Sequence, residues 1–427
     1  MLALVALAAL SLVHGQTAQD VSRLSVTYSI TNYGSLELEK TARSGSDYAL
    51  FDGRYYTDKP PGMSFLAVPP FLVARVVTAG VAPGQWHHRT DYQVWWLRLA
   101  TSGVLFIVCV LLVGRVADDL VAGTGGATAA TLGLGTLMSP LAATMFDHVP
   151  AAALGFAAFF AARRANHLLA GVCAGFAVLV EYQAALVAAV IFAYLIGRGA
   201  AALGRYVAGA LPLLALLALY DRLAFGSPMH LSYRYVSNQF AEQQRRGFFG
   251  IGLPRAHGLE QVLVGYKGLL LFSPVLVAAA LGLVLLSRRH RAEAVVCAAI
   301  TLLFLLSNSG YFLPYGGTSP GPRFFVPALP FLALGLPCAF QRWPLPTLVL
   351  ALASVVLTTL DALTWSFRPD EDTTVTGVWN HHDFVHAFWV AFTDSAFASG
   401  IAIAVVAVAA LVAAFPPVLR RLPVKAS

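Results

Sequence analysis

The sequence has little charge for its length. Only 11% of its 427 residues are Asp, Glu, Lys or Arg, whereas 58% are hydrophobic and the mean hydropathy is +0.70. A soluble protein of this size needs more charge to cover its surface. The composition therefore excludes a soluble globular fold and leaves room for about a dozen bilayer crossings of roughly 20 apolar residues each.

Cysteine is scarce as well, with Cys109, Cys173, Cys297 and Cys338 as the four in the chain. All of them lie inside apolar runs and far apart in sequence. This spacing favours free, buried thiols over a disulfide framework or a metal site.

Nucleotide-binding motifs are missing. The chain has no Walker-type loop, no Gly-x-Ser-x-Gly elbow and no dinucleotide fingerprint after a strand. Its net charge of +7 does not indicate nucleic-acid binding, because the basic residues fall in short gaps between apolar runs. The positive-inside rule places such gaps in the cytoplasm.

These gaps predict a topology of about twelve crossings with both termini inside. The first crossing covers residues 1–14, and residues 62–82 are expected to lie at the outer interface because they contain Pro69, Pro70 and Arg75. The remaining apolar runs are 94–113, 125–143, 149–162, 168–180, 184–196, 206–220, 269–286, 294–306, 324–340, 345–363 and 396–418. The long polar loops then face outward, at 16–93, 221–268 and 364–395.

Two residues of the first outer loop are candidates for chemistry. Asp20 follows the first apolar run, and a partly desolvated carboxylate at the membrane edge suits a general base. The alternative is a solvated aspartate near a helix end. Lys59 precedes two prolines that fix the backbone, so its ammonium can be presented to a lipid phosphate. The alternative is a simple turn into the interfacial helix.

Further acidic candidates lie in two very short outer gaps. Asp147 with His148, and Glu181, sit between apolar runs near the outer ends of helices. Ionisable residues in such places are functional candidates. With Asp20 they could converge on one pocket or on one divalent cation, and the alternative is a hydrogen-bonded polar cluster.

Two cations open outward-facing helix ends. Lys267 precedes a glycine, and Arg323 follows the Gly/Pro-rich loop 316–322. Backbone amides in such a loop can approach an anion, and both side chains can bind phosphate. The alternative is ordinary snorkelling of cations at the interface.

A rival site is formed by His382 and His386, which are four residues apart with Asp383 between them. Zinc proteases carry two histidines at this spacing. The acid here is Asp rather than Glu, and no third ligand is evident, so a cluster of loop histidines is the favoured interpretation.

Four segments carry a resemblance to a known family: Asp20 with Arg23, DGRYYTDKPPG at 52–62, YKGLLLFSP at 266–274, and GPRFFVPALPF at 321–331. They resemble membrane glycosyltransferases of the GT-C fold, in particular the bacterial protein O-mannosyltransferase and aminoarabinose transferase group. The resemblance implies an all-α integral membrane fold with about 11–13 crossings. One transmembrane glycosyltransferase domain is expected over 1–427, without a soluble C-terminal domain.

The resemblance also implies the reaction. The donor would be a sugar, such as mannose or another hexose or pentose, on a polyprenyl phosphate. The acceptor would be a protein, glycan or lipid at the outer face of a bacterial inner membrane, and the anomeric carbon would be inverted. By position, Asp20 and Asp147 would be catalytic; Lys59, Lys267 and Arg323 would bind the donor phosphate; Arg23, His148 and Glu181 would contact the acceptor or a divalent cation.

A flippase or transporter of lipid-linked sugars is the main alternative. Such a protein needs polar residues through the bilayer, but the ionisable groups of this chain cluster at the ends of the apolar runs. The sequence therefore favours an enzyme with its site at one membrane surface.

Overall fold

The computed structural model describes residues 1–14, 17–38, 47–77, 92–364, 386–387 and 396–419, which are mostly helical. The helices are α1 (Leu2–Leu10), α2 (Ala18–Tyr33), α3 (Gly62–Val77), α4 (Tyr92–Arg98), α5 (Val104–Leu120), α6 (Gly125–Leu134), α7 (Met138–Leu141), α8 (His148–Arg163), α9 (His167–Val180), α10 (Ala185–Ile196), α11 (Ala200–Phe225), α12 (Ala241–Gln244), α13 (Ala256–Val264), α14 (Leu269–Phe272), α15 (Val275–Leu286), α16 (Arg291–Gly310), α17 (Leu329–Ala333), α18 (Leu336–Arg342), α19 (Pro344–Thr364), α22 (Ala396–Ala414) and α23 (Pro416–Leu419). The shorter elements are the π-helix η3 (Leu99–Gly103), the 3-10 helices η4 (Tyr182–Ala184), η5 (Ser232–Tyr235) and η6 (Arg323–Ala328), and the strands β1 (Leu12–Val13), β2 (Tyr48–Phe51), β3 (Arg54–Thr57) and β4 (His386–Ala387).

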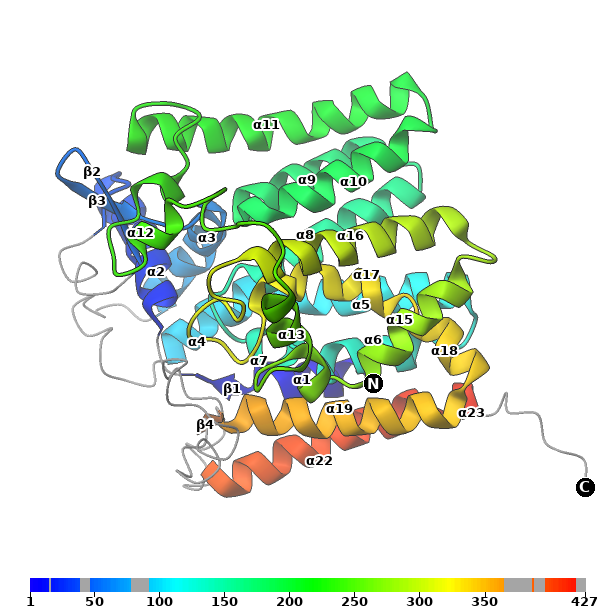
Figure 1. The fold of residues 1–427 in the computed structure, drawn as a ribbon. Helices are drawn as coiled ribbons and strands as arrows, with labels where there is room; N and C mark the ends of the chain where they lie inside the picture. Colours follow the sequence, from blue (N-terminus) through cyan, green and yellow to red (C-terminus); the bar gives the residue numbers. More distant parts are fainter. Residues whose placement is uncertain (15–16, 39–46, 78–91, 365–385, 388–395, 420–427) are drawn as a thin grey trace, which may run out of the picture.

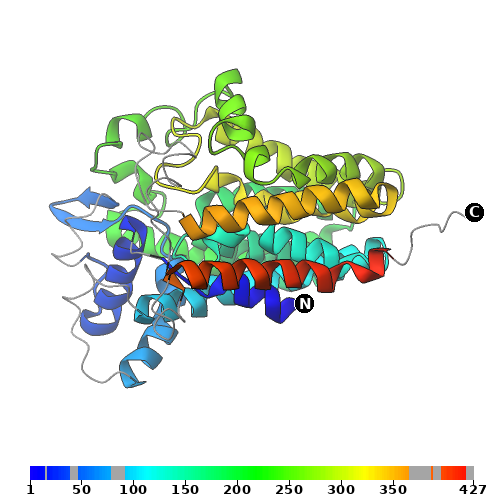
Figure 2. The same ribbon diagram turned by 90° about the horizontal axis from the view of Figure 1, so that it is seen from below.

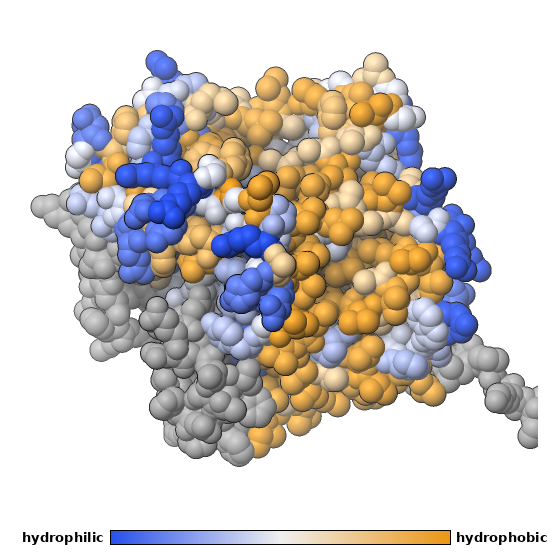
Figure 3. Space-filling model, viewed as in Figure 1, coloured by the Kyte–Doolittle hydropathy of each residue, from blue (hydrophilic) through white to orange (hydrophobic). Residues whose placement is uncertain are grey.

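The long helices lie side by side in one bundle, and α2, α3, α12 and the β2–β3 hairpin gather at one end of it (Figure 1, Figure 2). On the face shown in Figure 3, a broad hydrophobic area covers the bundle between two more polar ends. Apolar side chains that point outward in this way need lipid around them. The chain is a multi-pass integral membrane protein.

Fewer helices are long and apolar enough to cross a membrane than the sequence predicted. Five helices are long and apolar enough to cross, or up to seven if each strongly bent pair is one span. Four further apolar helices have 10–17 residues, among them α8, α9 and α3. A crossing needs roughly 20 residues at 1.5 Å each, so the prediction of about twelve spans is not confirmed for the described residues.

Ion pairs join three of the gaps that were predicted to lie together in the cytoplasm. Arg164 contacts Asp119 at 2.9 Å, and Arg163 lies 3.5 Å from both Asp119 and Glu293. These residues come from the end of α5, the end of α8 and the start of α16. The positive-inside pattern therefore grouped these gaps correctly at one end of the bundle. All four cysteines are free, as predicted.

The first outer loop holds more than the interfacial helices expected there. Strands β2 and β3 form an antiparallel hairpin, and Asp52 and Gly53 turn between them with φ of 50° and 73°. Two consecutive positive φ values define a type I′ turn, for which Asp-Gly is a preferred sequence. Helix α3 then packs against α2 and the end of α9. A Cβ on Gly62 would lie 2.6 Å from the Leu179 carbonyl oxygen, so only glycine allows this approach.

Candidate active site

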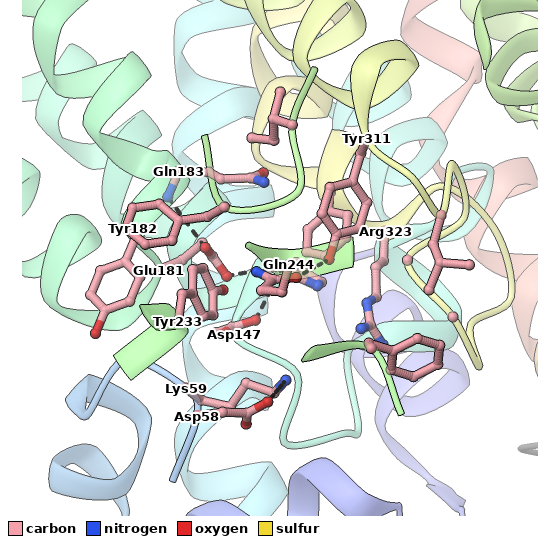
Figure 4. A pocket seen from close by; sticks show the side chains of 18 of the residues that line it. Asp58, Lys59, Asp147, Glu181, Tyr182, Gln183, Tyr233, Gln244, Tyr311 and Arg323 are labelled. Carbon is pink, nitrogen blue, oxygen red and sulfur yellow. Dashed lines mark hydrogen bonds and ion pairs between the residues drawn. The ribbon is translucent and has the colours of Figure 1, made fainter. Parts of the chain in front are cut away.

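A cavity of about 1000 Å³ lies at the end of the bundle that carries the hairpin. Its polar walls come from the start of α2, the segment after the hairpin, the residue before α8, the α9–η4 junction and two long loops. The charged residues that line it are Arg23, Asp47, Asp58, Lys59, Asp147, Glu181 and Arg323. Side chains from most of these point into one space (Figure 4).

Arg23 and Asp147 form a fully buried ion pair between α2 and the residue that precedes α8. The guanidinium donates to one carboxylate oxygen of Asp147 and to Oε1 of Gln19. Burial alone would raise the pKa of Asp147, but the neighbouring Arg23 outweighs it and lowers this pKa to about 2. Asp147 is therefore an ionised carboxylate, and a hydrogen bond with Glu181 also helps to lower its pKa.

His148 and Glu181 stand beside Asp147. Nδ1 of His148 is 3.1 Å from Oδ1 of Asp147 and 3.6 Å from Oε2 of Glu181. Burial and the negative charge of Asp147 raise the pKa of Glu181 well above its usual range, which favours the neutral form of this acid. The ligand atoms of the three residues lie within 4.8 Å of one another, and the group could hold a metal ion.

Lys59 lies immediately after the hairpin, and its backbone N–H donates to Oγ1 of Thr57 at 3.1 Å. Its ammonium is 3.2 Å from Asp58 and 3.5 Å from Asp47. Burial would lower the pKa of Lys59, but the two carboxylates raise it overall, so the side chain is charged. Burial raises the pKa of Asp58 to about 6 although Lys59 opposes the shift.

Arg323 begins η6 and stacks between two aromatic rings. Its guanidinium carbon is 4.8 Å from the centre of Phe146 and 5.3 Å from that of Phe324. It donates to the Thr318 carbonyl at 3.5 Å. Within the part of the chain that the structure describes, no carboxylate lies within ion-pair distance of Arg323. The stacking holds the cation in place while leaving its charge available to an anion.

Asp20 is placed differently from these residues and does not line the cavity. One oxygen accepts from the N–H and hydroxyl of Thr17, both at 2.7 Å, which forms a capping box at the start of α2. The carboxylate also pairs with the buried Arg98, with N···O distances of 2.8 and 3.0 Å, and accepts from the Met145 N–H at 3.3 Å. Its lone pairs are thus committed to helix capping and a buried ion pair.

Lys267 also lies outside the cavity. It is buried, its ammonium is 5.7 Å from the centre of the Tyr266 ring, and it interacts electrostatically with Asp361 of α19. His382, one half of the zinc-protease pattern, falls outside the described residues, and its partner His386 pairs with Val13 between strands β4 and β1. The rival site therefore stays a prediction.

Several polar residues of the cavity were assigned no role from the sequence. Asp58 belongs to the DGRYYTDKPPG segment, and Tyr233, Gln244 and Tyr311 come from predicted outer loops (Figure 4). The Tyr311 hydroxyl donates to Oε1 of Gln244 at 3.2 Å. Hydrogen-bonding side chains and aromatic faces of this kind suit a sugar ring.

The fold is that of the GT-C membrane glycosyltransferases. One protein with a similar structure is ArnT from Cupriavidus metallidurans. Its apo structure matches 97% of this chain and 73% of its own length at a TM-score of 0.55 and 16% identity. The structure of the same protein bound to undecaprenyl phosphate matches 98% and 74% at a TM-score of 0.55 and 15% identity. No protein-family model and no curated protein matches the chain.

Proposed function

We propose that this protein is an inverting glycosyltransferase, which moves a sugar from a polyprenyl phosphate to an acceptor at the outer face of a bacterial inner membrane. The observation that carries the proposal is the cavity, where Lys59 and Arg323 face the ionised Asp147 at one end of a membrane bundle. The likeness to ArnT, solved with undecaprenyl phosphate, supports the choice of donor. The sugar would be a hexose or pentose, and the acceptor a protein, glycan or lipid.

The cavity continues into the membrane part of the bundle. Val178 of α9, Leu186 of α10 and Leu217 of α11 line it together with Leu303 and Leu306 of α16. A polyprenyl chain is as apolar as these side chains and cannot leave the bilayer. The carrier can therefore keep its tail among the helices while its phosphate reaches the charged end.

The cations suit the leaving group. Negative charge develops on the phosphate as the glycosidic C–O bond breaks. Fixed cations therefore stabilise the transition state more than the ground state. Arg323 is stacked in place and can bind phosphate oxygens through two N–H groups. Lys59 supplies a second positive charge from the hairpin side.

We assign the general base to Asp147, because it is an ionised carboxylate that lines the cavity. Inversion needs the acceptor to attack the anomeric carbon from the face opposite to the phosphate. Asp58 pairs with Lys59, one of the two proposed phosphate-binding cations, whereas Asp147 pairs with Arg23, to which no phosphate contact is assigned. The acceptor oxygen forms the new bond to carbon, the phosphate departs with the electron pair of the old bond, and the acceptor proton passes to Asp147. The base role expected for Asp20 is thereby transferred to another carboxylate.

The variant Asp147→Asn tests this role. It keeps the shape of the side chain, so we expect it to bind undecaprenyl phosphate but to lose about 10²–10⁴-fold in transfer rate. Transfer is measured in membranes with a labelled lipid-linked sugar, and binding is measured on the purified protein. Wild-type transfer by this variant would remove Asp147 from the mechanism.

Metal dependence is a separate question for the same residues. Asp147 already pairs with Arg23, and burial beside Asp147 favours the neutral form of Glu181, so the group offers a cation little uncompensated negative charge. We therefore expect transfer to continue after EDTA treatment and removal of the chelator. Two results together would show that Asp147 is a metal ligand instead of the base. EDTA would abolish an activity that Mn²⁺ then restores, and His148→Ala would bind less metal than wild type.

A further inference from the structure

Lys59 faces two carboxylates although it carries a single charge, and the two are held differently. Oδ2 of Asp58 is 3.2 Å from Nζ of Lys59, and the Asp58 side chain is 4% exposed. The backbone carbonyl of Asp58 accepts a hydrogen bond from the Ser232 hydroxyl at 2.9 Å. Asp47 is 3.5 Å from the same Nζ and 16% exposed, so it is the more distant and more accessible of the two carboxylates, both of which line the cavity. Asp47 is therefore the partner that an incoming anion can displace.

The reaction changes the charge that Lys59 must hold. The donor is a phosphodiester with one negative charge, whereas the released polyprenyl monophosphate carries up to about two at neutral pH. A carboxylate beside the same ammonium repels the monophosphate more than the diester. The presence of Asp47 therefore weakens binding of the product more than binding of the donor.

We propose that Asp47 is a competing counter-ion for Lys59, which neutralises this ammonium in the free enzyme and promotes release of the polyprenyl monophosphate after transfer. The inference rests on the proposed function, because it requires the phosphate to bind at Lys59. It assigns Asp47 a role in product release rather than in bond breaking. Asp58 remains with Lys59 throughout and keeps the ammonium in position.

The test compares Asp47→Asn with a matched control, Glu37→Gln. Glu37 pairs with Arg54 on the outside of the hairpin at 3.2 Å and does not line the cavity, so its substitution makes the same change in net charge away from the site. Dissociation constants for undecaprenyl monophosphate are measured by calorimetry in detergent, with uncharged undecaprenol as reference. We expect Asp47→Asn to bind the monophosphate about tenfold more tightly and to be inhibited by correspondingly less of it, whereas Glu37→Gln behaves as wild type.

Two other outcomes would overturn the inference in distinguishable ways. If wild type binds the monophosphate and Asp47→Asn binds it equally or more weakly, Asp47 merely positions Lys59 and the proposed function stands. If wild type does not prefer the monophosphate to undecaprenol, both the inference and the donor assignment are wrong. An equal gain in Glu37→Gln would show a general charge effect and would also remove Asp47 from product release.

Discussion

The variant Lys59→Met is expected to lose about 10²–10³-fold in sugar transfer. It keeps the alkyl stem of the side chain and removes only the ammonium, which is the hairpin-side cation of the cavity. Loss of one preformed donor to a developing oxyanion has effects of this size. Binding of undecaprenyl phosphate should weaken as well, since the cation acts on both the ground state and the transition state. Both quantities are measured on membranes and on purified protein, as for Asp147→Asn.

Two control variants make this result specific. Arg54→Met removes a cation from the same hairpin, but Arg54 is exposed and does not line the cavity, so transfer should be unchanged. Lys267→Met removes the other lysine that the sequence suggested for phosphate binding. Because Lys267 does not line the cavity, its loss should leave transfer unchanged. A fall in transfer equal to that of Lys59→Met would contradict the assignment of Lys59 as the phosphate-binding lysine.

Hydropathy and charge were sufficient to predict the membrane class and the plane of the site. Five residues that were predicted to lie in outer gaps line one cavity at one end of the bundle: Arg23, Lys59, Asp147, Glu181 and Arg323. The rule that sorts gaps by their basic residues depends only on the neighbouring sequence. Grouping at one membrane surface is therefore readable from a single chain.

Which of the residues at that end line the cavity could not be predicted from the sequence. Asp20 and Lys267 were predicted to lie in or next to outer gaps, as the cavity residues were, but neither lines the cavity. Hydropathy gives the length of each span and says nothing about which neighbours it packs against. The spacing of Thr17 and Asp20 did carry a usable signal, because a hydroxyl residue three positions before an acid indicates a capping box. Its tertiary partner Arg98 lies 78 residues later and had no such signal.

The variant Arg98→Met should destabilise the fold by about 3–5 kcal/mol, because it leaves the buried Asp20 carboxylate without its counter-ion. Arg98 also donates to the His14 carbonyl at 2.6 Å, so the change loosens the connection from α1 to α2. The stability is measured as resistance to unfolding in detergent. Loss of transfer should follow loss of folded protein, not precede it.

A double variant separates this structural role from catalysis by Asp20. Adding Asp20→Asn to Arg98→Met removes the orphaned charge, while the amide oxygen can still accept from Thr17. The double variant should therefore be more stable than Arg98→Met alone, and it should regain transfer in proportion to the folded fraction. If Asp20 is instead the general base, the double variant will recover stability and undecaprenyl phosphate binding but remain without transfer, since no carboxylate is left at that position to take the acceptor proton.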